Sequence, residues 1–444
     1  MRGVDGGWIG ACADRARGLT TVLTIAAALF LALTGPASAT GEVPPERNAN
    51  VLDLQDQLLP VADEITKKLG DDLGGIWLDY DDQEPLKIGA PTDIADPVKS
   101  RLEELISTSG VAEMVQIVTV DDTLAELEAA QDEIDERLHQ ARDKTPDPNA
   151  PASLTYIDTA RNRAVVVFGD DIDAQGRAVV EADADEAPAD VMIAAEAATN
   201  PIYGTACGPD PYWEEGKFNF CNRPLRAGPF IYNHAASGGV GGCTAGFMLR
   251  QNGTGAIWAL TAGHCRTMWL AQGSTGIYTE GYPGLLEYGI GQAAMGTWGW
   301  GGDFAFVSVT NPFWYVGPYV FQDSTWLTPR EELHLTNVVG STYYGMWMCH
   351  SGGVKIPGKN WSDCGGVEAV NVTATYSTTY GYASVSGLAR SNVCSIEGDS
   401  GGPVWATNRA LGIIVAGDFA TPPCVTYFQP IQTPLSWGNM SLYN

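Results

Sequence analysis

The chain has 444 residues and a formal net charge of −28, from 53 acidic and 25 basic residues. A chain of this length exceeds one average domain and is expected to divide into two or three segments. The acidity belongs to one of them: residues 40–200 hold 37 acidic and 12 basic residues, whereas residues 201–444 hold 14 and 10. Because neither part offers a basic stripe, nucleic acid is not expected as a partner.

Residues 1–39 have the pattern of a secretory signal. Arg2, Arg15 and Arg17 precede an apolar run at 22–33, and the small residues at 37–39 (ASA) suit a signal peptidase. A membrane anchor is the alternative, but about twelve apolar residues fall short of the roughly twenty that a span needs. We therefore expect a secreted, extracellular protein that begins near Thr40 and makes no membrane contact after the signal is removed.

Residues 40–200 are predicted to form a small α/β domain. Leu124, Leu127, Ile134 and Leu138 recur near helical spacing within 121–144. The runs at 114–120 (MVQIVTV) and 164–168 (AVVVF) are typical of strands. A disordered acidic tail is the alternative, mainly for the ends of the segment. The Ala- and Asp-rich residues 181–200 are predicted to be a linker.

Residues 201–444 are predicted to be all-β. Short apolar runs at 255–260, 304–309, 367–375 and 411–416 are separated by turns that contain Gly, Pro or Asn. No amphipathic helix of useful length appears among these residues. A segment of this size can bury a large core, either in a sandwich or in paired barrels.

The nine cysteines follow the same division. Cys12 lies in the signal, none lies between 40 and 200, and eight lie from Cys207 onward. An even number in an exported chain indicates disulfides, although eight cysteines allow about 105 pairings. Pairing of neighbours in sequence would give Cys207–Cys221, Cys243–Cys265, Cys349–Cys364 and Cys394–Cys424. No pair has the close spacing of zinc ligands, so no metal is expected.

Two motifs carry the chemistry of this segment. Residues 261–265 read Thr-Ala-Gly-His-Cys, and residues 398–403 read Gly-Asp-Ser-Gly-Gly-Pro. A serine hydroxyl is a poor nucleophile unless a base takes its proton, and His264 can supply that base for Ser400. The glycines around Ser400 permit a tight turn that exposes backbone N–H groups to a developing oxyanion. Together the motifs indicate a serine protease.

A carboxylate that orients the histidine completes such a site. Asp303 is the best candidate, because it begins the apolar run Asp303-Phe304-Ala305-Phe306-Val307 and would be drawn inward with it. The alternative is that Asp303 only caps a turn. Asp323 and Asp363 lie in polar loops and suit the role less well. The order His264, Asp303, Ser400 is one of the known orders of this triad.

Residues 202–444 resemble the chymotrypsin family, and more closely its secreted bacterial branch of the streptogrisin and alpha-lytic type. The resemblance rests on the two motifs, on residues 391–394 (SNVC) and 427–430 (YFQP), and on the loop between Cys349 and Cys364. It implies two antiparallel six-stranded β-barrels with the triad between them and a disulfide from Cys243 to Cys265. It also implies that the N–H groups of Gly398 and Ser400 form the oxyanion hole, and that Asp399 is buried and paired with an unassigned partner.

The sequence departs from that branch near the expected pocket. Val415 stands where a serine commonly hydrogen-bonds the triad aspartate, so either Asp303 is satisfied otherwise or the alignment slips by one residue. By the same alignment Asn392, Val393 and Gly417 bind the substrate side chain. The base of that pocket has no acidic residue, which predicts cleavage after large apolar or aromatic residues. Asp418, beside the wall, is the residue that could change this preference.

The bacterial branch is made with a long N-terminal pro-region that assists folding and then inhibits the enzyme. Residues 40–200 have the position, size and cysteine-free character of such a region, and β-barrels with many non-local contacts fold slowly unassisted. We expect a monomeric zymogen cut between Asp190 and Tyr203. The alternative is that the segment only inhibits or solubilises the enzyme.

The predicted function is therefore a secreted serine endopeptidase that hydrolyses polypeptides through an acyl-enzyme and needs no cofactor. A catalytically silent homologue that acts as a binding protein is the main alternative, although such proteins usually lose a triad residue. An esterase of the α/β-hydrolase type is disfavoured by the triad order and by the lack of alternating helices and strands.

Overall fold

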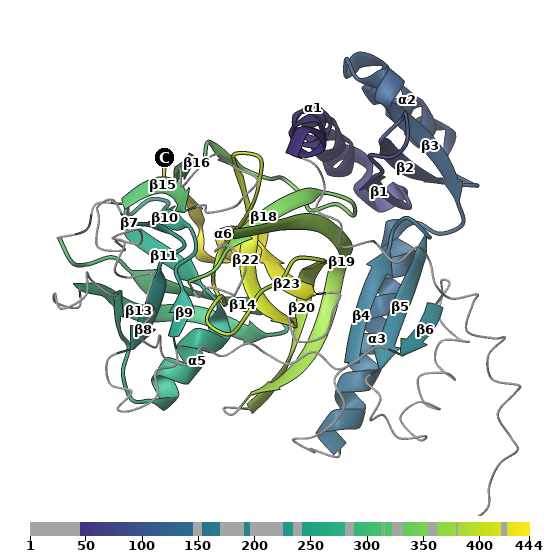
Figure 1. The fold of residues 1–444 in the computed structure, drawn as a ribbon. Coiled ribbons are helices and arrows are strands. Elements are labelled where there is room, and N and C mark those ends of the chain that lie inside the picture. Colours follow the sequence, from purple (N-terminus) through teal and green to yellow (C-terminus); the bar gives the residue numbers. More distant parts are fainter. Residues whose placement is uncertain are drawn as a thin grey trace, which may run out of the picture. The chain divides into compact units, whose positions relative to one another are not determined.

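The computed structural model describes residues 45–144, 153–168, 191–195, 225–233, 242–279, 288–312, 314, 316–321, 332–353, 362–378, 381–418 and 424–444. The predicted secretory signal and the cysteines at 207 and 221 lie outside these residues, and so does the expected cleavage region except for Val191–Ala195. Pro45–Asn444 forms one compact unit (Figure 1). Among the described helices, none combines the length and apolar character needed to cross a lipid bilayer.

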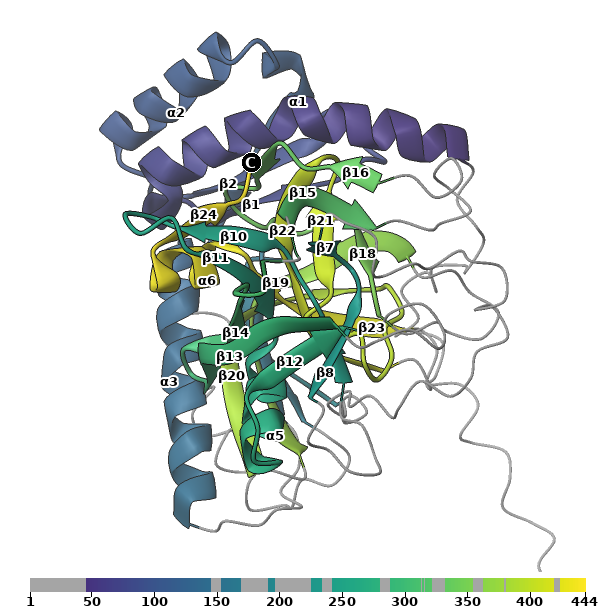
Figure 2. The same cartoon turned by 90° about the vertical axis from the view of Figure 1, so that its left-hand side faces the viewer.

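The first part of this unit is a small sheet covered by two helices. Helix α1 (Pro45–Leu69) is followed by the short turn η1 (Gly70–Asp72) and by strands β1 (Gly75–Leu78) and β2 (Leu86–Pro91). Helix α2 (Asp96–Thr108) and turn η2 (Ala112–Met114) then lead to β3 (Val115–Val120), which pairs in parallel with β2. Helix α2 lies against α1 (Figure 2). Both helices lie outside the segments whose sequence pattern predicted a helix or a strand.

A second α/β part follows, as predicted. Helix α3 (Leu124–Lys144) begins where Thr123 forms a capping box with Glu126, whose backbone N–H donates to Thr123 Oγ1 (3.1 Å). The helix packs on strands β4 (Ser153–Asp158) and β5 (Arg163–Phe168), and β6 (Val191–Ala195) pairs with β5. The helix within 121–144 and the strands near 114–120 and 164–168 are confirmed. The prediction of a linker over 181–200 is wrong for Val191–Ala195, which pair with β5 as a strand.

The rest of the chain is all-β, as predicted, and its first large sheet has eight strands in the order β24-β10-β11-β14-β13-β12-β8-β9. Their bounds are β8 (Phe230–Asn233), β9 (Gly242–Thr244), β10 (Met248–Gln251), β11 (Ile257–Thr261), β12 (Gly276–Thr279), β13 (Tyr288–Gly299), β14 (Gly302–Ser308) and β24 (Met440–Leu442). A six-stranded barrel was expected here. The short β24 adds to β10 at one edge, and among the described residues no pairing closes the sheet into a ring.

The second large sheet closes into the expected six-stranded barrel, because β18 pairs with both β21 and β19. Its strands are β18 (Trp347–Ser351), β19 (Ser362–Thr378), β20 (Gly381–Ser391), β21 (Pro403–Ala406), β22 (Arg409–Asp418) and β23 (Val425–Pro430), with β17 (Asn337–Val338) beside β22. Smaller elements are β7 (Leu225–Ala227), β15 (Val316–Phe321), β16 (Glu332–His334), α5 (Gly263–Ala271) and α6 (Gln432–Gly438).

The N-terminal part joins this barrel through a shared sheet and shared cores. Strand β4 pairs antiparallel with β19, so that β4, β5 and β6 extend the barrel sheet to ten strands (Figure 1). Leu58 and Ile65 of α1 are fully buried in the same apolar cluster as Ile414 and Phe428 of the barrel. Burial of apolar surface between the two parts explains why they form one compact unit.

Candidate active site

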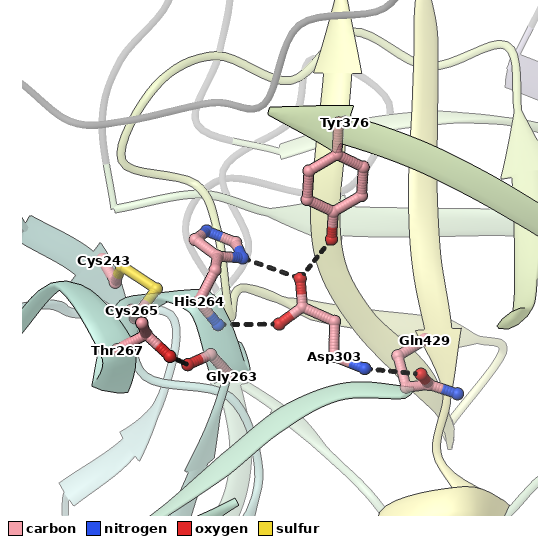
Figure 3. Close-up of polar contacts among 8 residues, drawn as sticks. All are labelled: Cys243, Gly263, His264, Cys265, Thr267, Asp303, Tyr376 and Gln429. Atoms are coloured by element: carbon pink, nitrogen blue, oxygen red, sulfur yellow. Dashed lines mark hydrogen bonds and ion pairs between the residues drawn. A yellow bond between two sulfur atoms is a disulfide. The ribbon is translucent and has the colours of Figure 1, made fainter. Parts of the chain in front are cut away.

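His264 and Asp303 form a doubly hydrogen-bonded pair (Figure 3). The backbone N–H of His264, in the first turn of α5, donates to Asp303 Oδ1 (2.9 Å), and the ring Nδ1 lies 2.7 Å from Oδ2. The His264 and Asp303 side chains are 1% and 0% exposed. Because a carboxylate only accepts hydrogen bonds, Nδ1 carries the proton, which leaves Nε2 as the basic nitrogen. Asp303 therefore fixes both the tautomer and the orientation of the imidazole.

Asp303 is held by two further contacts that come from the second barrel. The hydroxyl of Tyr376 in β19 donates to Asp303 Oδ2 (2.5 Å), and the backbone N–H of Asp303 donates to Gln429 Oε1 (3.0 Å). Val415 is fully buried and apolar. Of the two explanations left open by the sequence, the structure therefore supports the first: Asp303 is satisfied by a group other than residue 415. No motif marked Tyr376, which lies 73 residues from Asp303 in sequence.

The loop that carries Ser400 lies against the segment that presents His264. Ser400 O accepts a hydrogen bond from Thr244 N (2.7 Å), and Thr244 Oγ1 donates to Gly398 O (2.7 Å). Gly398 and Gly401 have φ values of 97° and 88°, in the left-handed region that favours glycine. A Cβ on Gly401 would lie 3.0 Å from the backbone nitrogen of Ala262, two residues before His264. The loop thus needs glycine both for its turn and for its close approach.

Asp399 holds this loop in shape from within. Its Oδ2 accepts a hydrogen bond from Ile396 N (2.9 Å), and its backbone carbonyl accepts one from Gly402 N (2.7 Å). Asp399 is 1% exposed, and a Cβ on Gly352 would overlap its carboxylate. The sequence could not assign these contacts, because they join backbone groups and a glycine that no motif marks.

Two of the three residues expected to bind the substrate side chain, Gly417 and Val393, are connected through Thr426. Gly417 in β22 pairs with Thr426 in β23, whose hydroxyl donates to Val393 O (2.8 Å). Val393 is buried, and Asn392 Oδ1 accepts a hydrogen bond from Gly366 N (2.9 Å). Gly417 and Val393 therefore lie close together, and Asn392 precedes Val393 in the chain, while the Asp418 side chain lies outside the described residues.

Three of the four expected disulfides are present: Cys243–Cys265, Cys349–Cys364 and Cys394–Cys424. The first ties β9 to the residue after His264. Cys243, His264 and Cys265 lie close enough together to resemble metal ligands, but both sulfurs belong to the disulfide and cannot act as thiolates. The expected Cys207–Cys221 bridge lies outside the described residues.

Comparisons with known proteins support the resemblance. No protein-family model matches the sequence. Serine protease 2 of Streptomyces fradiae is 32% identical over 200 residues, which are 44% of this chain and 94% of that protein. Streptogrisin-C of Streptomyces griseus is 30% identical over 225 residues, which are 49% of this chain but only 41% of that longer relative. Protease A of Thermobifida fusca, a crystal structure, is 26% identical, covers 50% of this chain and all of its own, and gives a TM-score of 0.37. Since the match to Serine protease 2 spans nearly the whole of that protein, this chain belongs to the chymotrypsin family of bacterial serine proteases.

Proposed function

We propose that this chain is a serine endopeptidase in which Ser400 is the nucleophile, His264 the general base and acid, and Asp303 the group that orients it. The observation that carries the proposal is the buried pair of hydrogen bonds between His264 and Asp303, 2.9 and 2.7 Å long. The close packing of the Ser400 loop on the segment before His264 supports the same assignment.

The reaction follows from this arrangement. Ser400 Oγ attacks the carbonyl carbon of the scissile peptide bond and passes its proton to His264 Nε2, while Asp303 stabilises the imidazolium. The backbone N–H groups of Gly398 and Ser400 stabilise the oxyanion, for which each donor is worth roughly 100- to 1,000-fold in rate. The imidazolium then protonates the leaving amine, and an acyl-enzyme forms that water hydrolyses by the reverse steps.

The substrate side chain enters a pocket formed by Asn392, Val393 and Gly417 in this proposal. Their uncharged character and the lack of a side chain on Gly417 favour a large apolar or aromatic residue before the scissile bond. Cleavage of a peptide library tests this preference. A profile dominated by Arg, Lys or Glu would overturn it, and Asp418 would be the first residue to examine.

The chain is made as a secreted zymogen in this proposal, with residues 40–200 as pro-region and folding assistant and a cut between Asp190 and Tyr203. The shared sheet and the shared apolar core support a pro-region that stabilises the second barrel. The mature enzyme acts as a monomer. If an enzyme expressed without residues 40–200 reached the same active yield, these residues would not assist folding.

The mass of the exported protein, with and without a fluorophosphonate, tests the activity directly. One adduct on a C-terminal fragment that begins near residue 201, lost in Ser400→Ala, would support both the nucleophile and the cleavage. No adduct on a correctly cut fragment would favour a catalytically silent binding protein. No adduct on an uncut chain would mean that the N-terminal part still blocks the site, and cleavage in trans would then be the next step.

A further inference from the structure

We infer that Tyr376 is a positioning residue of this site: its hydroxyl supplies the hydrogen bond to the Asp303 carboxylate that a serine at position 415 would otherwise give. The inference rests on the proposed function. The inference adds a residue that no sequence motif marks, and this residue comes from the six-stranded barrel whereas Asp303 lies in the eight-stranded sheet.

The contact between Tyr376 and Asp303 is short and buried. The Tyr376 hydroxyl lies 2.5 Å from Asp303 Oδ2, and the Tyr376 residue is 2% exposed (Figure 3). Its ring also packs beside that of Trp298, with the ring centres 6.4 Å apart. The phenol is thus held by packing as well as by the hydrogen bond, which limits the entropy lost when the bond forms.

The acceptor oxygen explains the chemical role. Asp303 Oδ2 lies 2.7 Å from His264 Nδ1 and also accepts the bond from Tyr376, whereas Oδ1 accepts from the His264 backbone. A fully buried carboxylate needs such donors to offset its lost hydration. A donor on the same oxygen that faces the imidazole withdraws negative charge from it. Tyr376 therefore sets both the orientation of the carboxylate and how strongly it stabilises the imidazolium.

Tyr376 lies just beyond the part of β19 that pairs with the N-terminal strand β4. Tyr376 lies in β19, opposite Ala383 of β20, and β4 pairs with β19 at Thr373 and Ala374. The strand of the N-terminal part thus ends its pairing two residues before Tyr376. In the described residues, the polar side chains that contact the carboxylate come from α5 and β19, and Gln429 of β23 accepts from the backbone of Asp303.

The test is Tyr376→Phe, which keeps the ring and removes only the hydroxyl. We expect kcat/KM of the mature enzyme to fall roughly ten- to hundred-fold, mostly in kcat, as for a lost hydrogen bond to a charged group. We also expect the acid limb of the kcat/KM profile to move to higher pH, because a carboxylate without this donor holds the imidazolium more strongly. Titration with a fluorophosphonate counts the competent sites in each preparation.

Two companion variants separate positioning from packing. The double variant Tyr376→Phe/Val415→Ser returns a hydroxyl at the position where the resemblance places the usual donor, and it should recover part of the loss. Tyr343→Phe is the matched control, since this buried hydroxyl contacts Asp63 and Thr66 of α1 rather than the site. It should leave the pH profile of the mature enzyme unchanged.

A ring-fluorinated tyrosine at position 376 keeps the hydroxyl and makes it a stronger donor, so it tests the inference even if Tyr376→Phe does not mature. The acid limb should then move to lower pH. If the wild-type enzyme is active but neither replacement at position 376 moves the pH profile of kcat/KM, the role of Tyr376 is overturned and the proposed function stands. An inactive wild-type fragment would instead remove the proposed function itself.

Discussion

The side-chain amide of Gln55 pairs with both backbone groups of Trp347. Its Nε2 donates to Trp347 O (2.9 Å), its Oε1 accepts from Trp347 N (2.7 Å), and Gln55 is fully buried. Helix α1 thereby supplies, from a side chain, the two hydrogen bonds that a neighbouring strand would give to β18. The hydroxyl of Tyr80 donates to the same Oε1 (2.6 Å) and fixes the amide.

Replacing Gln55 by Ala should therefore weaken the packing of helix α1 on strand β18 of the barrel. Each buried polar group left unpaired costs about 1–3 kcal/mol, so loss of both Trp347 contacts should lower the free energy of unfolding by about 2–6 kcal/mol. Urea unfolding of the full chain in the Ser400→Ala background, where self-cleavage is prevented, measures this loss. Gln57→Ala on the same helix is the control, because the Gln57 contact is exposed. Equal effects of the two changes would contradict the role given to Gln55.

Asp63 makes the stability of the contact between helix α1 and the segment around Tyr343 depend on pH. Burial raises the pKa of its carboxyl, although the Tyr343 hydroxyl donates to Oδ1 (2.8 Å) and Gly340 N donates to Oδ2 (3.2 Å). A raised pKa in the folded chain means that the protonated form is favoured there. The stability from Asp63 is thus fully present below its ordinary pKa of 3.8 and is lost as pH rises through the raised value.

The variant Asp63→Asn should remove the loss of unfolding free energy that accompanies ionisation of Asp63 as pH rises. The measurement is the difference in unfolding free energy between variant and parent, followed from acid to neutral pH in the Ser400→Ala chain. Glu64→Gln provides a control of opposite sign, because Lys68 lowers the pKa of Glu64 and its contribution is lost as pH falls. The variant-minus-parent difference should rise with pH, because only the parent loses stability there, and a difference that falls instead would refute the assignment.

Gly352 is expected to tolerate no side chain. A Cβ there would overlap the Asp399 carboxylate, which accepts the Ile396 N–H and shapes the nucleophile loop. Gly352→Ala should reduce fluorophosphonate labelling by at least about tenfold through the displaced oxyanion donors. The nearest atom to a Cβ on Gly276 lies 3.4 Å away, an ordinary contact, so Gly276→Ala should label normally. Full labelling of the Gly352 variant would show that Asp399 does not control the loop.

The Cys243–Cys265 disulfide closes a loop with a sequence separation of 22 and ends beside His264. Replacing both cysteines by Ala should cost about 3 kcal/mol of stability from the loss of loop constraint. It should also lower kcat, since the residue after His264 loses its tie to β9. The same change at Cys349 and Cys364, with a separation of 15, should lower stability with less effect on kcat. Denaturant unfolding and initial rates distinguish the two bridges.

The sequence predicted those parts of the site that lie in local motifs. His264 and Ser400 each sit among residues whose types are dictated by turns, and Asp303 begins an apolar strand, so each could be recognised from its neighbours. Tyr376 could not, because its contact with Asp303 depends on how the eight-stranded sheet and the barrel lie relative to each other. Gln55 and Trp347 are separated by 292 residues, and no local pattern encodes such a pairing.

The order of strands in the first sheet could not be read from the sequence for the same reason. The C-terminal β24 pairs with β10 through Met440 and Gln251, an association that only the folded chain defines. In contrast, helix α3 was placed within a few residues, because its apolar spacing and its cap at Thr123 are both local in sequence.

If the proposed cleavage removes the N-terminal part, the pairing of β4 with β19 has a consequence for the remaining protein. Removal of β4 leaves the segment from Val370 to Ala374 as an open sheet edge, the kind of edge on which further chains can assemble into aggregates. The register shifts between Val370 and Thr373, and Asn371 lies there with a φ of 52°. This irregularity breaks the run of evenly spaced N–H and C=O groups that an incoming strand would need. An edge interrupted in this way pairs with β4 but discourages fibrous self-association in a form of the protein that lacks β4.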